Sequence, residues 1–266
     1  MFVEVFDLEK TLTCGQCFHY VKHNDGYIVF GESSICYIEQ KGNNININTK
    51  DIDYWKKYFS LDKNYKNINK VLISQCNKNN DFFAIDCINF ASGIRILRQP
   101  LFETCCSYIL SQQNNISRIQ RMIFSLSEKY SSVSDNFDNV EYKLFPSYED
   151  LKFCKIENFK ELGFGYRAEY LYDFIQSWPE IQNKLLKTSD YESHFKLLKE
   201  CNGIGDKVAN CICLYGLNHL EAFPIDTWMK KVIDDEYTSK NRNLKLPSKN
   251  AGILQQYMFY TKRNRQ

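Results

Sequence analysis

The spacing of apolar residues changes once along this chain, from the spacing of strands to the spacing of helices. Residues 17–48 read as short strands separated by N-D-G and K-G-N turns. From Asp51 onward the apolar residues recur at helical intervals, beginning with Ile52, Trp55 and Phe59. The pattern predicts an α+β fold in which an antiparallel sheet is followed by helices.

Four later segments divide the helical part. We predict one helix over residues 101–109, with Pro100 in its first turn, and a second over residues 116–126. The polar stretch at residues 131–141 reads as a loop. The segment E-L-G-F-G-Y-R-A-E-Y at residues 161–170 reads as a glycine-rich turn that leads into a further helix.

The length of the chain allows more than one core. With 266 residues and 44% apolar side chains, we expect a sheet domain with flanking helices over residues 1–95 and two mostly helical domains over residues 96–266. No run of eighteen apolar residues occurs, and the amino-terminal segment lacks the basic and apolar regions of a signal peptide. We therefore expect an intracellular protein that does not insert into a membrane.

The cysteines do not indicate disulfides or a metal. There are eleven, an odd number, and they are scattered along the chain, so we expect them to be reduced and mostly buried. The single C-x-x-C, Cys14 to Cys17, has no second pair at a zinc-like spacing. No cysteine follows Cys213, which argues against a carboxy-terminal iron–sulfur loop. We expect no cofactor and no catalytic metal.

The charge of the chain is informative only at its carboxy-terminal end. The net charge of +2 fits many kinds of protein. Residues 237–266, however, contain seven basic side chains and no acidic one. This segment is either a surface that faces phosphates or a solvated tail, and the sequence leaves both open.

A helix-hairpin-helix is predicted at about residues 194–217. Helical spacing up to Cys201 is followed by N-G-I-G and then by a second amphipathic helix. Gly203 and Gly205 permit a tight reversal and a close approach of the backbone to a phosphate, and the amides at the start of the second helix form an anion site. Asp206 is placed to cap that second helix.

Lys207 is unusual because it falls in the first turn of the second helix, where the helix dipole disfavours a cation. One interpretation is a partly buried amine that acts as a carbon nucleophile. The other is a solvent-facing lysine or one that neutralises a phosphate. Downstream, the aspartate of F-P-I-D-T-W-M, Asp226, is either a helix cap or a carboxylate that supports developing positive charge.

Several stretches taken together resemble one family of enzymes. They are the hairpin with its lysine and P-I-D, G-I-R-I-L-R-Q-P-L-F-E at residues 93–103, S-Q-Q-N-N-I-S-R-I at 111–119, and L-G-F-G-Y-R-A at 162–168. This combination is similar to the 8-oxoguanine DNA glycosylases of the helix-hairpin-helix superfamily, from about Phe6 to the carboxy terminus. The resemblance implies a cleft between helical domains that receives a nucleotide flipped out of bent duplex DNA.

The resemblance also implies roles for individual residues. Lys207 would attack C1′ of the damaged nucleotide and form a Schiff base with the sugar, and Asp226 would support the charged sugar while capping its helix. The residues implied in binding the base are Gly15, Cys211, Pro224, Gln255 and Phe259. Among these, the Gly15 carbonyl would accept the N7 hydrogen that only the oxidised base carries, and the Gln255 amide would meet the Watson–Crick edge.

A further set is implied in contacts with DNA: Gln113, Asn114, Arg118, Tyr166, Arg167, Gly203, Gly205 and Trp228. Tyr166 would be a wedge beside the orphaned base, and Arg118 and Arg167 would read the opposite cytosine. Two positions depart from the family pattern: Gln113 stands where asparagine is usual, and Trp228 replaces a histidine. The hairpin could also hold a monovalent cation through carbonyls near Lys199, Cys201 and Ile204.

These observations predict a monomeric enzyme that excises 8-oxoguanine opposite cytosine in duplex DNA and cleaves the abasic strand by β-elimination. Its location would be the cytoplasm of a bacterium or the nucleus of a eukaryote. One alternative is a glycosylase of the same fold for another damaged or mispaired base. The other is a non-catalytic DNA-binding module.

Overall fold

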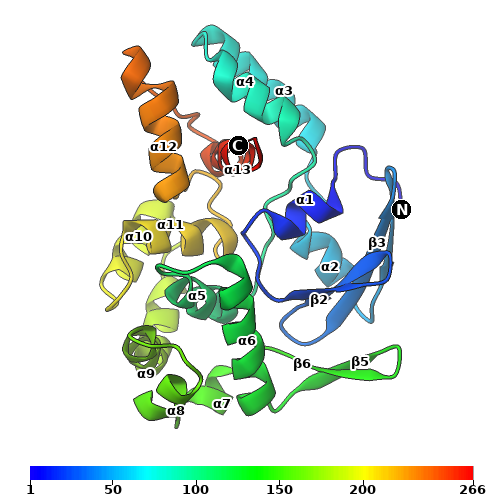
Figure 1. Cartoon of the computed structure of the whole chain (residues 1–266), viewed down its shortest axis with the longest axis vertical. Coiled ribbons are helices and arrows are strands. Elements are labelled where there is room, and N and C mark those ends of the chain that lie inside the picture. Colours follow the sequence, from blue (N-terminus) through cyan, green and yellow to red (C-terminus); the bar gives the residue numbers. More distant parts are fainter. Residues whose placement is uncertain (266) are drawn as a thin grey trace.

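The amino-terminal part of the chain forms helix α1 (Leu8–Thr13) and then a four-stranded antiparallel meander (Figure 1). The structure is a computed structural model that describes residues 1–265. The strands lie in chain order: β1 (Tyr20–His23), β2 (Gly26–Phe30), β3 (Ile35–Lys41) and β4 (Asn44–Asn48). The first hairpin pairs His23 with Gly26, and Asn24 between them has the positive φ of 49° that such tight turns require. The predicted sheet is confirmed.

Both faces of the sheet are covered, which explains why β2 is buried along its whole length. On one face, Val29 and Ile38 pack against Trp55 of α2 (Ile52–Tyr58). On the other, Phe30 packs with residues of a later segment, among them Leu144. Burial of these side chains, each favourable by about 1.5–3 kcal/mol, holds the sheet between two layers.

That later segment is a second hairpin, which corrects the predicted loop at residues 131–141 and the prediction that the chain remains helical after residue 51. Strands β5 (Ser134–Phe137) and β6 (Val140–Lys143) pair across a turn in which Asp138 and Asn139 both have positive φ. The polar sequence of β5 does not indicate a strand, because the contacts that stabilise this strand come from residues distant in sequence. The Asp135 carboxylate accepts hydrogen bonds from the Ile35 backbone N–H at 3.1 Å and from Lys50 Nζ at 2.6 Å.

The remainder of the chain is helical, as predicted. The elements are α3 (Tyr65–Lys78), α4 (Phe82–Phe90), α5 (Leu101–Leu110), α6 (Ile116–Tyr130), α7 (Tyr148–Leu151), α8 (Ile156–Glu161), α9 (Arg167–Leu185), α10 (Tyr191–Lys199), α11 (Asp206–Tyr215), α12 (Thr227–Glu236), the 3₁₀ turn η1 (Thr238–Lys240) and α13 (Ala251–Asn264). Pro100 is the residue immediately before α5, and the glycine-rich turn does lead into α9.

Helices α3 and α4 pack with the carboxy-terminal helices, on the upper side of the view in Figure 1. The Tyr257 hydroxyl of α13 bonds Asn69 of α3 at 3.0 Å, and the Tyr237 hydroxyl bonds the Asp81 carboxylate, which caps α4, at 2.9 Å. Their buried side chains belong to the large helical core, whereas α1 and α2 share the core of the sheet. The boundary expected at residue 95 stays a prediction.

The helix-hairpin-helix is formed by α10 and α11. Gly203 has a φ of +79°, and a Cβ there would lie 2.3 Å from Tyr170 Cγ, so only glycine fits this reversal. The residue before α11 is Gly205, and Asp206 is the first residue of the helix. The prediction that Asp206 caps α11 is therefore wrong, since its carboxylate instead pairs with Lys199 Nζ at 2.6 Å.

The cysteines are all free thiols, and ten of the eleven are buried. Burial raises the pKa of both Cys14 and Cys17 to about 12. Within residues 1–265, no group of three or more His, Cys, Asp or Glu side chains is placed to hold a metal ion. Within residues 1–265, no helix is both long enough and apolar enough to cross a lipid bilayer.

Candidate active site

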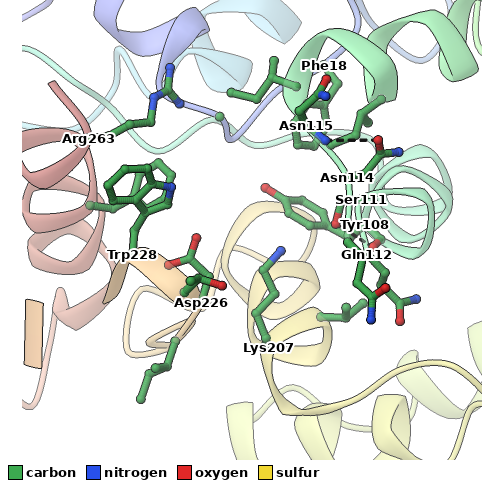
Figure 2. Close-up of a pocket in the computed structure, with 18 of the residues that line it drawn as sticks. Phe18, Tyr108, Ser111, Gln112, Asn114, Asn115, Lys207, Asp226, Trp228 and Arg263 are labelled. Atoms are coloured by element: carbon green, nitrogen blue, oxygen red, sulfur yellow. Dashed lines mark hydrogen bonds between the residues drawn. The ribbon is translucent and has the colours of Figure 1, made fainter. Parts of the chain in front are cut away.

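A cleft of about 930 Å³ opens where the helix-hairpin-helix faces the turn between α5 and α6. Its other walls are the start of α12, the end of α13 and the loop after α1 (Figure 2). Of the residues implied in function, those that line it are Gly15, Gln113, Asn114, Gly205, Lys207, Asp226, Trp228 and Phe259. The fold thus brings together positions separated by more than two hundred residues in sequence.

Lys207 projects from the first turn of α11 into the cleft, with its amine between Asp226 and Tyr108 (Figure 2). The side chain is half-buried, and Nζ lies 5.2 Å from the centroid of the Tyr108 ring. That ring is fixed from behind by Tyr215, stacked at 5.6 Å, and its hydroxyl donates to the Gln16 carbonyl at 3.2 Å. The aromatic ring therefore restricts where the amine can point.

Cys211 lies one turn after Lys207 on α11 and is buried. Burial raises the pKa of its thiol to about 11, although the nearby Lys207 ammonium opposes this rise. Cys211 does not line the cleft, whereas Lys207 does. The amine of Lys207 is therefore the candidate nucleophile that this helix presents to the cleft.

Asp226 occupies the position before α12, and its Oδ1 accepts a hydrogen bond from the Met229 backbone N–H at 2.9 Å. This confirms that Asp226 is a helix cap. The loop before it is held by Asn210 of α11, whose Oδ1 accepts from the Phe223 backbone N–H at 3.1 Å and from the Tyr191 hydroxyl at 2.8 Å. The carboxylate is therefore carried on a braced loop, opposite Lys207.

The residues implied in base binding occupy two layers. Gly15 and Phe259 line the cleft, and Gly15 has a φ of +90°, a conformation that favours glycine. Cys211, Pro224 and Gln255 are buried and lie outside the set that lines the cleft. The Gln255 Oε1 atom has no hydrogen-bond partner among residues 1–265. A buried unpaired amide oxygen is available to a ligand that carries a donor.

Most of the residues implied in DNA contacts lie at or near the α5–α6 turn, whereas Trp228 lies on α12. Gln113 has a left-handed backbone with a φ of 46°, and the half-exposed ring of Tyr166 reaches the same turn through a 3.3 Å hydrogen bond to the Gln112 carbonyl. Arg118 is exposed, with Nη2 3.4 Å from the Gly163 carbonyl.

Arg167 is placed differently from Arg118, because it is buried. Its Nε donates to the Gln112 carbonyl at 2.7 Å and its Nη2 to the Gln113 carbonyl at 2.9 Å. These bonds fix the turn, and the guanidinium would have to exchange them in order to read a base. Its predicted role in reading cytosine stays a prediction.

Trp228 is half-buried and lines the cleft, and Lys231 Nζ lies 5.0 Å from its ring centroid.

Of the seven basic residues in the carboxy-terminal segment, four form ion pairs with carboxylates: Lys240 with Glu236, Arg242 with Asp81, Lys262 with Asp235, and Arg265 with Asp86. Pairing leaves fewer free cations than the sequence suggests, which weighs against a large phosphate-facing surface there.

Sequence reasoning did not assign several lining residues to the cleft, among them Phe18, Tyr108 and Arg263. The sequence placed Tyr108 only within the helix expected over residues 101–109, and Arg263 only among the seven basic residues near the carboxy terminus. No local pattern identifies them, since each reaches the cleft only through packing between elements distant in sequence.

Comparison with known proteins agrees with this geometry. A family model described as the amino-terminal domain of 8-oxoguanine DNA glycosylase matches residues 2–105. The crystal structure of Clostridium acetobutylicum 8-oxoguanine glycosylase/lyase with duplex DNA containing cytosine opposite 8-oxoG superimposes with a TM-score of 0.88, 29% identity, and coverage of 98% of this chain and 92% of that one. The apo form of the same enzyme gives a TM-score of 0.84 and 31% identity, covering 96% of this chain and 92% of that one.

A Saccharomyces cerevisiae N-glycosylase/DNA lyase is 37% identical over 165 residues, which are 57% of this chain and 44% of the yeast protein. The chain thus spans less than half the length of this curated relative. A lysine-bearing helix-hairpin-helix beside a capping aspartate, attached to an antiparallel sheet, defines a helix-hairpin-helix DNA glycosylase fold. Within that class, the chain belongs to the 8-oxoguanine DNA glycosylase/lyase family.

Proposed function

We propose that this chain excises 8-oxoguanine from duplex DNA and then cleaves the abasic strand. The observation that carries the proposal is the Lys207 amine, held in the middle of the cleft between Tyr108 and Asp226 (Figure 2). A family match alone would not distinguish a catalytic chain from one that only binds DNA. An amine with a carboxylate across the same cleft supports a catalytic role.

Lys207 and Asp226 carry the reaction. The neutral Lys207 amine forms a bond to C1′ of the flipped nucleotide as the C1′–N9 bond breaks, and the base leaves with the bonding electron pair and takes up a proton. Nitrogen then loses a proton, and its lone pair forms the C1′=N bond of a Schiff base as the C1′–O4′ bond breaks and O4′ takes up a proton. Removal of a C2′ proton then expels the 3′ phosphate by β-elimination. The Asp226 carboxylate supports the positive charge that develops on the sugar and on nitrogen.

Selection of the base is assigned to the residues on either side of the cleft. Phe259 stacks on one face of the base and Cys211 lies toward the other, while Gln255 bonds the Watson–Crick edge and Gly15 accepts the N7 hydrogen. Ordinary guanine carries a bare N7 acceptor at that edge, so two acceptors would face each other. Such an unpaired buried contact costs about 1–3 kcal/mol.

Contacts to DNA are assigned to the α5–α6 turn and the hairpin. Tyr166 is the wedge beside the orphaned base, and Arg118 and Arg167 read the opposite cytosine. Gln113 fills the gap that the flipped base leaves, and Asn114 contacts the DNA next to it. Gly203 and Gly205 approach the phosphates of the lesion strand, with a monovalent cation near Lys199, Cys201 and Ile204. Trp228 presents a large apolar ring to the DNA where the family pattern has a histidine. The partner is double-stranded DNA, bound by a monomer in the bacterial cytoplasm or the eukaryotic nucleus.

Single-turnover assays on matched duplexes test this function. The substrates carry one 8-oxoguanine, one alkylated purine, or one adenine mispaired with guanine, and both base release and strand cleavage are measured. We expect release and cleavage with 8-oxoguanine only, fastest opposite cytosine. Faster release of the alkylated purine or adenine would favour a glycosylase for another base. Tight binding with neither release nor cleavage would favour a DNA-binding module.

A further inference from the structure

The loop after α1 has its main-chain carbonyl groups fixed on both sides of Gly15. Before Gly15, the Thr13 carbonyl accepts from Arg263 Nη2 at 3.2 Å, and the Cys14 carbonyl accepts from Gln256 Nε2 at 3.3 Å. Both donors belong to α13. The end of the chain thus holds a loop near its beginning.

After Gly15, the Gln16 carbonyl is held twice, by Gln99 Nε2 at 2.7 Å and by the Tyr108 hydroxyl at 3.2 Å. The Gln16 side chain is also bonded at both ends, to the Arg95 carbonyl and to the Leu97 backbone N–H. Among residues 1–265, only the Gly15 carbonyl in this stretch of four accepts no hydrogen bond from the protein.

An unpaired carbonyl between three paired ones, on a residue that lines the cleft, is a preorganised acceptor. The neighbouring peptide groups cannot rotate without breaking their own hydrogen bonds. The Gly15 carbonyl therefore needs little reorganisation when a donor binds to it. Residue 15 is a glycine with a φ of +90°. Glycine adopts this backbone conformation without strain, so the loop can hold the carbonyl in this orientation.

Arg263 is half-buried and borders the cleft at the end of this arrangement. It lies one turn after Phe259 on α13, and its guanidinium carbon is 5.9 Å from the Phe259 ring centroid. Its Nη1 would be 3.4 Å from a Cβ built on Gly15, and that nitrogen is buried without a hydrogen-bond partner among residues 1–265. The Arg263 side chain therefore lies beside both the loop of Gly15 and the Phe259 ring. Figure 2 shows Arg263 at the edge of the cleft.

We propose that Arg263 and Gln256 are positioning residues that hold the Gly15 carbonyl as the acceptor for an N–H group on the edge of an extruded base. The proposal rests on the proposed function and assigns these two residues a share of its base selectivity. Neither residue needs to touch the base. Their effect is on the placement of the Gly15 oxygen, so they matter only for steps in which a base occupies the cleft.

The test compares two duplexes, one with 8-oxoguanine opposite cytosine and one with a preformed abasic site, because cleavage at the abasic site requires no base recognition. The variants are Arg263→Met, Arg263→Lys and Gln256→Met. The matched control is Arg265→Met, which also removes an arginine from the end of α13 but one that pairs with Asp86, outside the cleft. Cleavage of the abasic duplex also reports whether each variant is folded.

In Arg263→Met we expect excision of 8-oxoguanine to fall about tenfold further than cleavage at the abasic site, which corresponds to about 1.4 kcal/mol. Gln256→Met should show the same split, Arg263→Lys should recover part of the loss, and Arg265→Met should show no split. Equal loss on both duplexes, or unchanged excision in Arg263→Met, would overturn the positioning role. A wild-type chain inactive on both duplexes would overturn the proposed function, and the positioning role with it.

Discussion

The Lys207 amine lies 5.2 Å from the centre of the Tyr108 ring, and the hydroxyl of the same ring donates to the Gln16 carbonyl at 3.2 Å. Tyr108 therefore joins the nucleophile on α11 to the loop that carries Gly15. A single residue of α5 links the two functions assigned to the cleft, attack on the sugar and selection of the base.

Substitutions at Tyr108 separate its ring from its hydroxyl. Tyr108→Leu should lower the free energy of unfolding by about 2–4 kcal/mol, because it removes a buried ring stacked on Tyr215. It should also slow attack by Lys207, because the amine loses the aromatic ring that restricts its position. Tyr108→Phe keeps the ring and should cost only about 1 kcal/mol. Urea unfolding and single-turnover rates measure both, and equal attack rates in the two variants would argue against a role for the ring.

Substitutions at Asp226 can separate its role as a helix cap from its proposed role in supporting positive charge. Asp226→Asn preserves an acceptor for the Met229 N–H, so stability should change by less than about 0.5 kcal/mol, whereas Asp226→Ala should cost about 0.5–2 kcal/mol through loss of the cap. Both remove the carboxylate charge and should slow excision on the order of a hundredfold. Rapid excision by a stable Asp226→Asn protein would show that the residue serves only as a cap.

The two glycines of the hairpin should respond differently to alanine. Gly203→Ala places a methyl group 2.3 Å from Tyr170 Cγ at a positive φ, and we expect a loss of stability above about 2 kcal/mol with weaker DNA binding. Gly205 has open space around its Cα, so Gly205→Ala should change stability by less than about 1 kcal/mol. Thermal unfolding measures both proteins. Equal stability of the two variants would contradict the tight reversal at Gly203.

The Asp135 carboxylate makes the second hairpin sensitive to acid. Burial opposes its ionisation, but hydrogen bonds from Lys50 and from the backbone of Ile35 and Asn136 outweigh burial and lower its pKa. Since the pKa is lower in the folded state, Asp135 stabilises the fold above about pH 4, and this contribution disappears as the pH falls through the folded-state pKa.

The difference in unfolding free energy between wild type and Asp135→Asn should therefore be larger at about pH 7 than at about pH 3. Urea titrations at the two pH values measure it. Asp138→Asn, at the exposed turn of the same hairpin, is the control and should show little change. A difference that is independent of pH would mean that the charge of Asp135 does not anchor the hairpin.

The elements that could be predicted from sequence are those defined by local signals. The meander follows from its turns, and the hairpin of α10 and α11 from glycines between two periodic segments. Lys207 and Asp226 drew attention because each falls at a helix start, but their catalytic roles were implied only by the resemblance to the glycosylases. The strand at Ser134–Phe137 could not be predicted, since its polar residues gain their partners from β3 and Lys50.

The rest of the cleft depends on long-range packing. Residues 15, 108 and 263 meet only when α1, α5 and α13 are packed together, and the sequence of α13 gives no sign that Arg263 differs from Arg265. Asp206 illustrates the same limit, because an ion pair with Lys199 on the preceding helix replaces the cap that its position suggests.

The central claim is that Lys207 is the nucleophile, and borohydride trapping tests it most directly. Wild-type protein mixed with the 8-oxoguanine duplex and borohydride should form a covalent adduct, as should Lys196→Gln, which alters an exposed lysine of α10 outside the cleft. Lys207→Gln should still bind DNA but lose at least about a hundredfold in adduct yield. An adduct of undiminished yield in Lys207→Gln would contradict the account.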